Sequence, residues 1–206
     1  MVYHVFNRSI AGYVIFNKGY EFERMMQMIP YYQAEKRSSS FSAFIKNKGA
    51  QKFRPLDEKD KLVDVIAYCF MPTHIHLVLK EMAEGGTTIF MSRILNSYSR
   101  YFNIKHNRRG PLWEGRYKKV LVTTDEQLLH LTRYVHLNPA TAYLVDVPSD
   151  WPFSSLGEYL SRVKPANRIC NYRDLLTIGS NQYLKFVKDG VSYQRELAKI
   201  KHLLLE

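Results

Sequence analysis

The chain has 206 residues, of which 46% are hydrophobic and 24% are charged, a composition typical of a globular protein. Lysine and arginine number 30 against 19 acidic residues, and the formal net charge of +11 favours a polyanionic partner, most commonly nucleic acid. No segment approaches the roughly 18 unbroken apolar residues of a membrane span, and Cys69 and Cys170 are too few for a disulfide framework or a zinc motif. Residues 1–7 lack the pattern of a secretory signal, so we expect a cytoplasmic protein without a membrane partner.

Hydrophobic periodicity, capping residues and turn residues predict the secondary structure. In chain order the elements are a strand (2–8), a helix (21–32), two strands (62–70 and 75–80), a helix beginning at Thr87 or Thr88, a strand (116–123) and a helix that runs from Asp125 and ends before Pro139. Residues 35–61 are rich in serine and basic residues, which indicates a long loop or an insertion. From Trp151 onward the sequence looks mostly helical and ends in an amphipathic stretch over residues 193–205.

The order of these elements predicts an α+β fold, namely a ferredoxin-like antiparallel sheet with helices on one face. A mostly helical C-terminal tail would follow it. We therefore divide the chain into a main domain of residues 1–150, with the insertion at about 35–61, and a helical C-terminal extension of residues 151–206. In this arrangement the helix that begins at Asp125 lies near the strand of residues 75–80.

Two histidines in the third predicted strand are the first candidate site. His74 and His76 are two residues apart, so their side chains point to the same face of a strand while Ile75 points to the other. Two imidazoles that converge on one point suit a metal ion. Two ordinary polar residues on a half-exposed face are the alternative, and spacing alone leaves both interpretations open.

The last predicted helix carries a second pair of candidate residues. Tyr134 and Asn138 are four residues apart and therefore share a helix face. Tyrosine is abundant, with 15 copies, so composition alone favours a packing role for Tyr134. Asn138 precedes Pro139 and can simply end the helix.

Three motifs in a fixed order carry a resemblance to a known family. They are His74-Ile75-His76 after Met-Pro, Gly110-Pro111-Leu112-Trp113 before a basic strand, and Tyr134 followed by Asn138-Pro139. Together they resemble the single-tyrosine transposases of the HUH nuclease superfamily, in particular the branch associated with repetitive extragenic palindromes. The resemblance covers about residues 2–160 and makes residues 1–150 a transposase-like catalytic domain. The related insertion-sequence branch usually has glutamine where this chain has Asn138.

The resemblance implies a metal-dependent enzyme that cleaves and rejoins single-stranded or hairpin DNA. His74, His76 and Asn138 would bind Mg²⁺ or Mn²⁺, although imidazoles also accept Zn²⁺. Tyr134 would attack the scissile phosphate and leave a 5′-phosphotyrosine link, which conserves the energy needed to rejoin strands without ATP. The candidates for DNA contacts are Arg108, Arg109, Trp113, Arg116, Lys118 and Lys119. A solvated surface position is the equal alternative for the charged residues, and a core position is the equal alternative for Trp113.

Two other functions stay open at this stage. A domesticated relative would bind hairpin DNA without cutting it, although the joint presence of the two histidines, the tyrosine and the asparagine favours an active enzyme. A metal hydrolase that activates water would use His74 and His76 but would give Tyr134 no role. The sequence also leaves open a homodimer, and with it the question whether Tyr134 acts in its own subunit or in a partner's.

Overall fold

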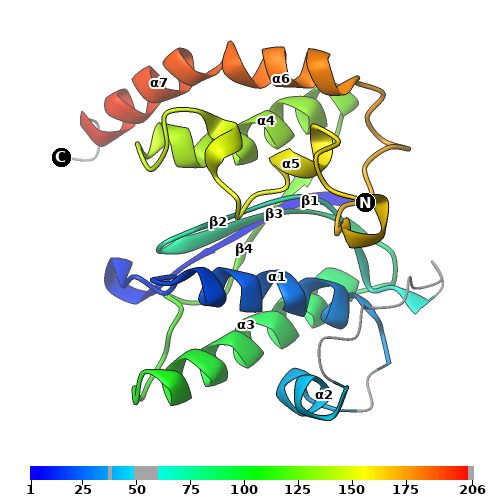
Figure 1. Cartoon of the computed structure of the whole chain (residues 1–206), viewed down its shortest axis with the longest axis vertical. Coiled ribbons are helices and arrows are strands. Elements are labelled where there is room, and N and C mark those ends of the chain that lie inside the picture. Colours follow the sequence, from blue (N-terminus) through cyan, green and yellow to red (C-terminus); the bar gives the residue numbers. More distant parts are fainter. Residues whose placement is uncertain (37–38, 49–59, 204–206) are drawn as a thin grey trace.

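The computed structural model describes residues 1–36, 39–48 and 60–203 and is built around a four-stranded antiparallel sheet (Figure 1). Its strands are β1 (Val2–Arg8), β2 (Val63–Met71), β3 (His74–Glu81) and β4 (Lys118–Val122), in the order β2-β3-β1-β4. β1 pairs with β3 on one side and with β4 on the other, and β2 and β3 form a hairpin. The predicted ferredoxin-like α+β fold is therefore confirmed.

Helices cover both faces of this sheet. They are α1 (Gly19–Gln33), α2 (Phe41–Lys48), α3 (Gly86–Lys105), α4 (Asp125–Thr141), α5 (Leu156–Tyr159), α6 (Ser180–Lys188) and α7 (Val191–Leu203). The connecting helices α1 and α3 share one face, as expected, whereas α4, α5, α6 and α7 form a layer over the opposite face (Figure 1). Every residue of β2 is buried because this strand is covered on both sides.

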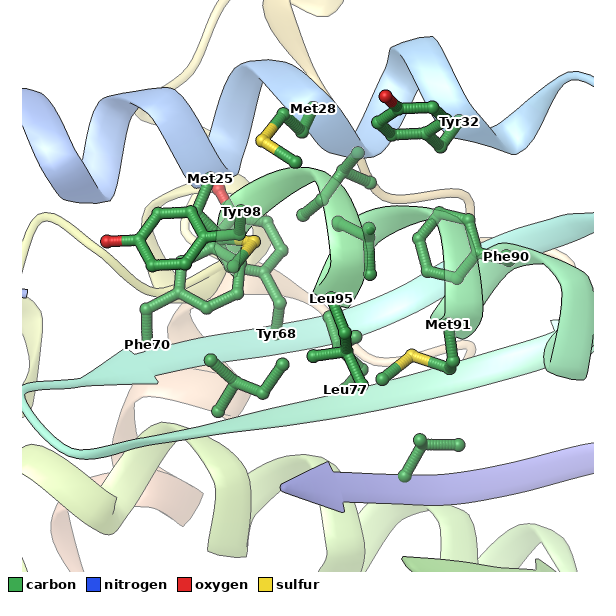
Figure 2. Packing of buried hydrophobic residues seen from close by; sticks show 14 of the residues in the cluster. Met25, Met28, Tyr32, Tyr68, Phe70, Leu77, Phe90, Met91, Leu95 and Tyr98 are labelled. Atoms are coloured by element: carbon green, nitrogen blue, oxygen red, sulfur yellow. The ribbon is translucent and has the colours of Figure 1, made fainter. Parts of the chain in front are cut away.

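The core between the sheet and the connecting helices is apolar and tightly packed. Figure 2 shows Met25 from α1 together with Phe90 and Tyr98 from α3, above Phe70 and Leu77 of the sheet. All five side chains are fully buried. Interdigitated side chains of this kind leave few voids, so this face supplies much of the stabilising burial.

Some predicted boundaries differ from the structure. The helix expected from Thr87 or Thr88 begins at Gly86. Gly85, the residue that precedes the helix, adopts a positive φ of 66°, which glycine tolerates. A Cβ at Gly86 would lie 2.1 Å from the Leu62 carbonyl oxygen, so this close approach requires glycine. The strand expected at 116–123 is confined to Lys118–Val122.

The segment at 35–61 contains helix α2 where we expected a loop or insertion, and its residues 37–38 and 49–59 lie outside the described residues. The predicted amphipathic end of the chain forms α7, while residues 204–206 also lie outside them. Within the described ranges, no helix has both the length and the apolar character needed to span a membrane.

Candidate active site

A pocket of about 260 Å³ opens on the face of the sheet that carries α4. Its walls come from β1, β3 and α4, three elements that are far apart in the sequence. The four residues that the sequence predicts as metal ligands and nucleophile all line it. The complete lining consists of His4, Phe6, Asn7, Arg8, His74, Ile75, His76, Tyr134 and Asn138.

Strand pairing places the two predicted histidines on the pocket side of the sheet. In the register of β1 and β3, Arg8 lies opposite His74 and Phe6 lies opposite His76. The side chain of Ile75 is fully buried in the core with α1 and α3, as strand alternation predicts. The two imidazoles therefore face the pocket side by side, with ring centroids 5.2 Å apart.

Each of these imidazoles has a hydrogen-bond partner at Nδ1. His76 Nδ1 lies 3.0 Å from His4 Nε2, and His74 Nδ1 lies 3.0 Å from the Thr73 hydroxyl oxygen. When the Nδ1–H groups donate to these partners, the Nε2 lone pairs of His74 and His76 stay free to bind a metal ion. In that arrangement of hydrogen bonds, His4 and Thr73 hold the two imidazoles in the tautomer that a metal site would need.

Burial keeps the pocket histidines neutral. Burial, together with the nearby charge of Arg8, lowers the pKa of His74 from its ordinary value of 6.5 to about 4. Burial also lowers the pKa of His4 to about 4. The pKa of His76 falls well below its ordinary value through burial and through the neighbouring His74, His4 and Arg8. Neutral imidazole is the form that binds metals, so the pocket is prepared for this role at neutral pH.

Tyr134 reaches the same pocket from α4. Its ring meets the His76 ring edge-on with centroids 5.7 Å apart, and the His4 ring at 6.1 Å. Burial raises the pKa of the phenol, whereas the charge of Arg8 and a hydrogen bond with the Asn138 side chain act in the opposite direction. The pocket therefore holds a tyrosine next to a cation that favours its deprotonated form.

Asn138 does not end the helix, contrary to the prediction that α4 stops before Pro139. The helix continues to Thr141 with Pro139 inside it. The side-chain amide of Asn138 donates to the Tyr134 carbonyl at 2.9 Å and approaches the Val135 carbonyl at 3.5 Å. Pro139 has no N–H, so the Val135 carbonyl lacks its usual backbone donor in the helix. The amide nitrogen of Asn138 is thus held by the helix backbone, and the side chain also hydrogen-bonds with the Tyr134 phenol in the pocket.

The donor set of the pocket fits a divalent metal ion. Among the described residues, no three histidine, cysteine or carboxylate side chains are arranged to hold one. A third protein ligand would therefore be an amide oxygen, and Asn138 lines the pocket beside His74 and His76. Two imidazole nitrogens and one oxygen would leave open coordination positions for a substrate.

A buried polar network anchors α4 to the C-terminal part of the chain. His136, which is fully buried, lies 2.7 Å from the Tyr183 hydroxyl through Nδ1 and 2.7 Å from the Ser155 hydroxyl through Nε2. His136 lies between Tyr134 and Asn138 in the sequence and points to the opposite side of the helix. The residues after Trp151 thus fix the helix that carries both of them.

The pocket also contains residues that the sequence analysis missed, notably His4 and Arg8 of β1. Both side chains share a face with Phe6 because they alternate along the strand. A histidine and an arginine on the same face of a mostly apolar strand were the available signal. The pairing of β1 with β3, which brings them to His74 and His76, is a long-range contact that local pattern does not reveal.

The first three candidates for DNA contacts lie near the C-terminal end of α3. The Arg108 guanidinium donates to the Pro111 carbonyl at 2.7 Å, while Arg109 is exposed. Trp113 packs in the core, and its Nε1–H donates to the Leu95 carbonyl at 3.3 Å. None of the three lines the pocket.

The other three candidates precede or belong to β4. Arg116 is exposed in the bend before the strand. Lys118 pairs with Phe6 in the sheet and therefore shares the face of the pocket. Lys119 lies on the opposite face, where it contacts Glu81 at 3.4 Å and the Tyr3 ring at 3.6 Å from the centroid. The two neighbouring lysines thus have different surroundings.

Comparison with known proteins finds similar sequences and a similar fold. A protein of Haemophilus influenzae assigned to the REP-associated tyrosine transposases is 28% identical over 103 residues, which make up 45% of this chain and 58% of the relative. The chain thus matches little more than half the length of that relative. A solved structure of a REP-associated tyrosine transposase bound to a REP hairpin has the same fold, with a TM-score of 0.50, 12% identity, and coverage of 82% of this chain and 86% of that one.

The family comparison covers the part of the pocket that β3 and α4 form. The family described as IS200-like transposase matches residues 31–138, which is just over half of the 206-residue chain. This range includes both histidines of β3 as well as Tyr134 and Asn138, but not β1. The chain therefore belongs to the IS200-like transposase family.

Proposed function

We propose that this protein is a metal-dependent single-stranded DNA transposase that cleaves and rejoins DNA through a 5′-phosphotyrosine intermediate. The observation that carries the proposal is the convergence of His74, His76, Tyr134 and Asn138 on one pocket. Membership of a transposase family and the net charge of +11 support a nucleic-acid substrate. The hairpin bound by the structural relative suggests hairpin DNA as the form to be tested first.

In the proposed reaction the Tyr134 phenolic oxygen attacks the scissile phosphorus. The new bond joins phosphorus to tyrosine, the bond from phosphorus to the 3′ oxygen breaks, and the departing strand takes a proton to end in a 3′-hydroxyl. The phenol must lose its own proton. An ordinary phenol has a pKa of about 10, so deprotonation at pH 7 costs about 4 kcal/mol. Arg8 lies where its charge favours both the tyrosinate and the substrate phosphate.

His74, His76 and Asn138 are the residues that would hold Mg²⁺ or Mn²⁺. When bound, such an ion polarises a phosphate oxygen and offsets the charge that develops during attack. His4 and Thr73 would hold the two imidazoles in the correct tautomer, since they bond both Nδ1 atoms.

The proposal includes action within one subunit. Tyr134 and both histidines belong to the same chain and line the same pocket. The network of His136 with Tyr183 and Ser155 holds α4 in this position. One chain thus contains the complete set of proposed catalytic side chains.

The alternative, a domesticated protein that binds hairpin DNA without cutting it, needs the basic surface but not the pocket. A single assay separates the two. Wild-type protein is incubated with labelled single-stranded hairpin DNA and Mg²⁺, Mn²⁺ or EDTA, and the products are separated on a denaturing gel. We expect a covalent protein–DNA adduct that needs the metal ion and that disappears in Tyr134→Phe.

Tyr143→Phe is a matched control because Tyr143 lies just beyond α4 and is 62% exposed. It should form the adduct as wild type does. An undiminished adduct in Tyr134→Phe would sink the tyrosine mechanism. Hairpin binding without any adduct would favour the binding protein, and cleavage without an adduct would indicate a hydrolase that activates water.

A further inference from the structure

The face of the sheet that carries the pocket is only partly covered. Helix α4 packs mainly against β2 and β3, and of the half formed by β1 and β4 only Val2 and Val122 join the apolar cluster under this helix. Lys118 is exposed and Val120 is 51% exposed on this side, although both belong to a strand of the central sheet. An antiparallel sheet can leave part of one face to solvent, so this part of the face is accessible to a ligand that extends out of the pocket.

Strand register connects this open half directly to the pocket. His76, Phe6 and Lys118 form one row across β3, β1 and β4, and His4 and Val120 belong to the next row. The Phe6 ring lines the pocket, with its centroid 5.9 Å from that of His76 and 6.0 Å from the Lys118 ammonium group. A ligand that leaves the pocket over β1 therefore meets an aromatic ring first and then a cation.

The charge of this surface suits a polyanion. Arg8 at one end and Lys118 at the other are both exposed, and none of the side chains that line the pocket is acidic. Within the described part of the chain, neither cation has a carboxylate partner among the ion pairs. An aromatic ring flanked by free cations is the combination that binds single-stranded nucleic acid by base stacking and phosphate contacts.

We propose that the open half of this face is a track for the single strand adjoining the scissile phosphate, with Phe6 stacking on a base and Lys118 binding a phosphate. The proposal rests on the proposed function, because the pocket defines where the strand begins. It adds a sequence-independent subsite that favours unpaired DNA, since a base can stack on Phe6 only when it is not stacked within a duplex. Phe6 and Lys118 then contribute to the affinity for the DNA strand, whereas Tyr134 carries out the cleavage reaction.

The test measures binding apart from chemistry. A Tyr134→Phe protein is titrated in EDTA with fluorescein-labelled oligothymidylate, and the anisotropy is followed at several salt concentrations. Phe6→Leu removes the ring but keeps an apolar side chain, and we expect it to weaken binding about 10-fold with an unchanged salt slope. Phe6→Tyr, which keeps a ring, should bind like its parent.

Lys118 and Lys119 provide a matched pair of variants, because they are neighbours in β4 but lie on opposite faces of the sheet. Lys118→Ala should lower the slope of log K against log salt by about 0.7, the value for one phosphate contact on a single strand. Lys119→Ala removes the same charge from the opposite face and should have the smaller effect. Equal effects of these two variants, parent-like binding by Phe6→Leu, or no binding of the oligothymidylate by the parent would each overturn the track.

The lysine pair decides the question even if Phe6→Leu fails to fold, because Lys118 and Lys119 are both exposed. The adduct assay with wild-type protein separates this proposal from the proposed function. An adduct without the expected binding pattern overturns the track alone. The expected binding pattern without an adduct supports the track and overturns only the tyrosine chemistry.

Discussion

The two faces of the central sheet bury different kinds of side chain. Between the sheet and α1 and α3, the core consists mainly of methionine, aromatic and aliphatic residues (Figure 2), with Glu21 and Gln33 of α1 as buried polar exceptions. Under α4 the apolar cluster is smaller, and it adjoins buried polar groups, among them His76, His136 and Glu158. Buried polar groups cost stability unless they are bonded, so the first face is expected to supply stability and the second to carry chemistry.

The largest expected effect is the loss of activity when a pocket histidine is removed. His76→Ala removes one proposed metal ligand, and we expect the rate of adduct formation to fall about 1,000-fold, since a metal ion contributes several kcal/mol to such a step. The free energy of unfolding should change by less than about 1 kcal/mol because the side chain lines a pocket. Adduct formation on gels and urea unfolding measure the two quantities.

Ile75→Val is the control on the opposite side of the same strand. It should cost about 0.5–1.5 kcal/mol of stability and leave the adduct rate per folded molecule unchanged. A stability loss in His76→Ala without a loss of activity would contradict the division between the faces.

The next effect concerns the stability of the α1 and α3 face. Phe90 is fully buried there, so Phe90→Ala should lower the free energy of unfolding by about 3–5 kcal/mol through lost burial and a new cavity. Ile89→Ala, at the adjacent position of α3 with 40% exposure, should cost far less. Urea unfolding checks both variants, and similar losses in the two would show that this face does not hold the main core.

The sequence predicts more of the first face than of the second, for a physical reason. Elements of the α1 and α3 face have clear hydrophobic periodicity, and the resulting strand and helix order was correct. In the pocket, His74 and His76 were predictable from strand alternation and Tyr134 and Asn138 from helix spacing. His4 and Arg8 were not, because they enter the pocket only through the pairing of β1 with β3, a contact between residues distant in the sequence.

The course of α4 past Pro139 shows a similar limit. Proline ordinarily ends a helix, and the sequence rule gave the wrong end point. In the structure, the amide of Asn138 donates to backbone carbonyls of the preceding turn and thereby supports the helix through the proline. Local propensity does not include this side-chain bond, which also restrains the side chain of a proposed metal ligand.

A smaller effect, on metal affinity, is expected when His4 is replaced, and it tests how the pocket positions His76. His4→Leu removes the hydrogen-bond partner of His76 Nδ1, and we expect the affinity for Mn²⁺ to fall about 10- to 100-fold, as for other partners of metal-bound histidines. His4→Gln offers an oxygen at a similar position and should restore most of the affinity. Isothermal titration calorimetry measures it, and equal affinities in His4→Leu and wild type would show that His4 has no positioning role.

The smallest expected effect is a pH dependence of stability on the α4 face. Burial lowers the pKa of His136 from 6.5 to about 3, so the native state keeps this imidazole neutral over a range in which the unfolded chain binds a proton. Because the unfolded state then holds more protons, the free energy of unfolding falls as the pH drops from about 6.5 towards 3.

Replacing this imidazole with a side chain that does not titrate should make the dependence shallower. In His136→Gln we expect the slope to decrease by up to about 1.4 kcal/mol per pH unit, the value for one proton. Urea unfolding of both proteins across this pH range measures the difference. Equal slopes in the two proteins would mean that His136 is protonated in the native state. The imidazole that bonds to Tyr183 and Ser155 would then carry a charge.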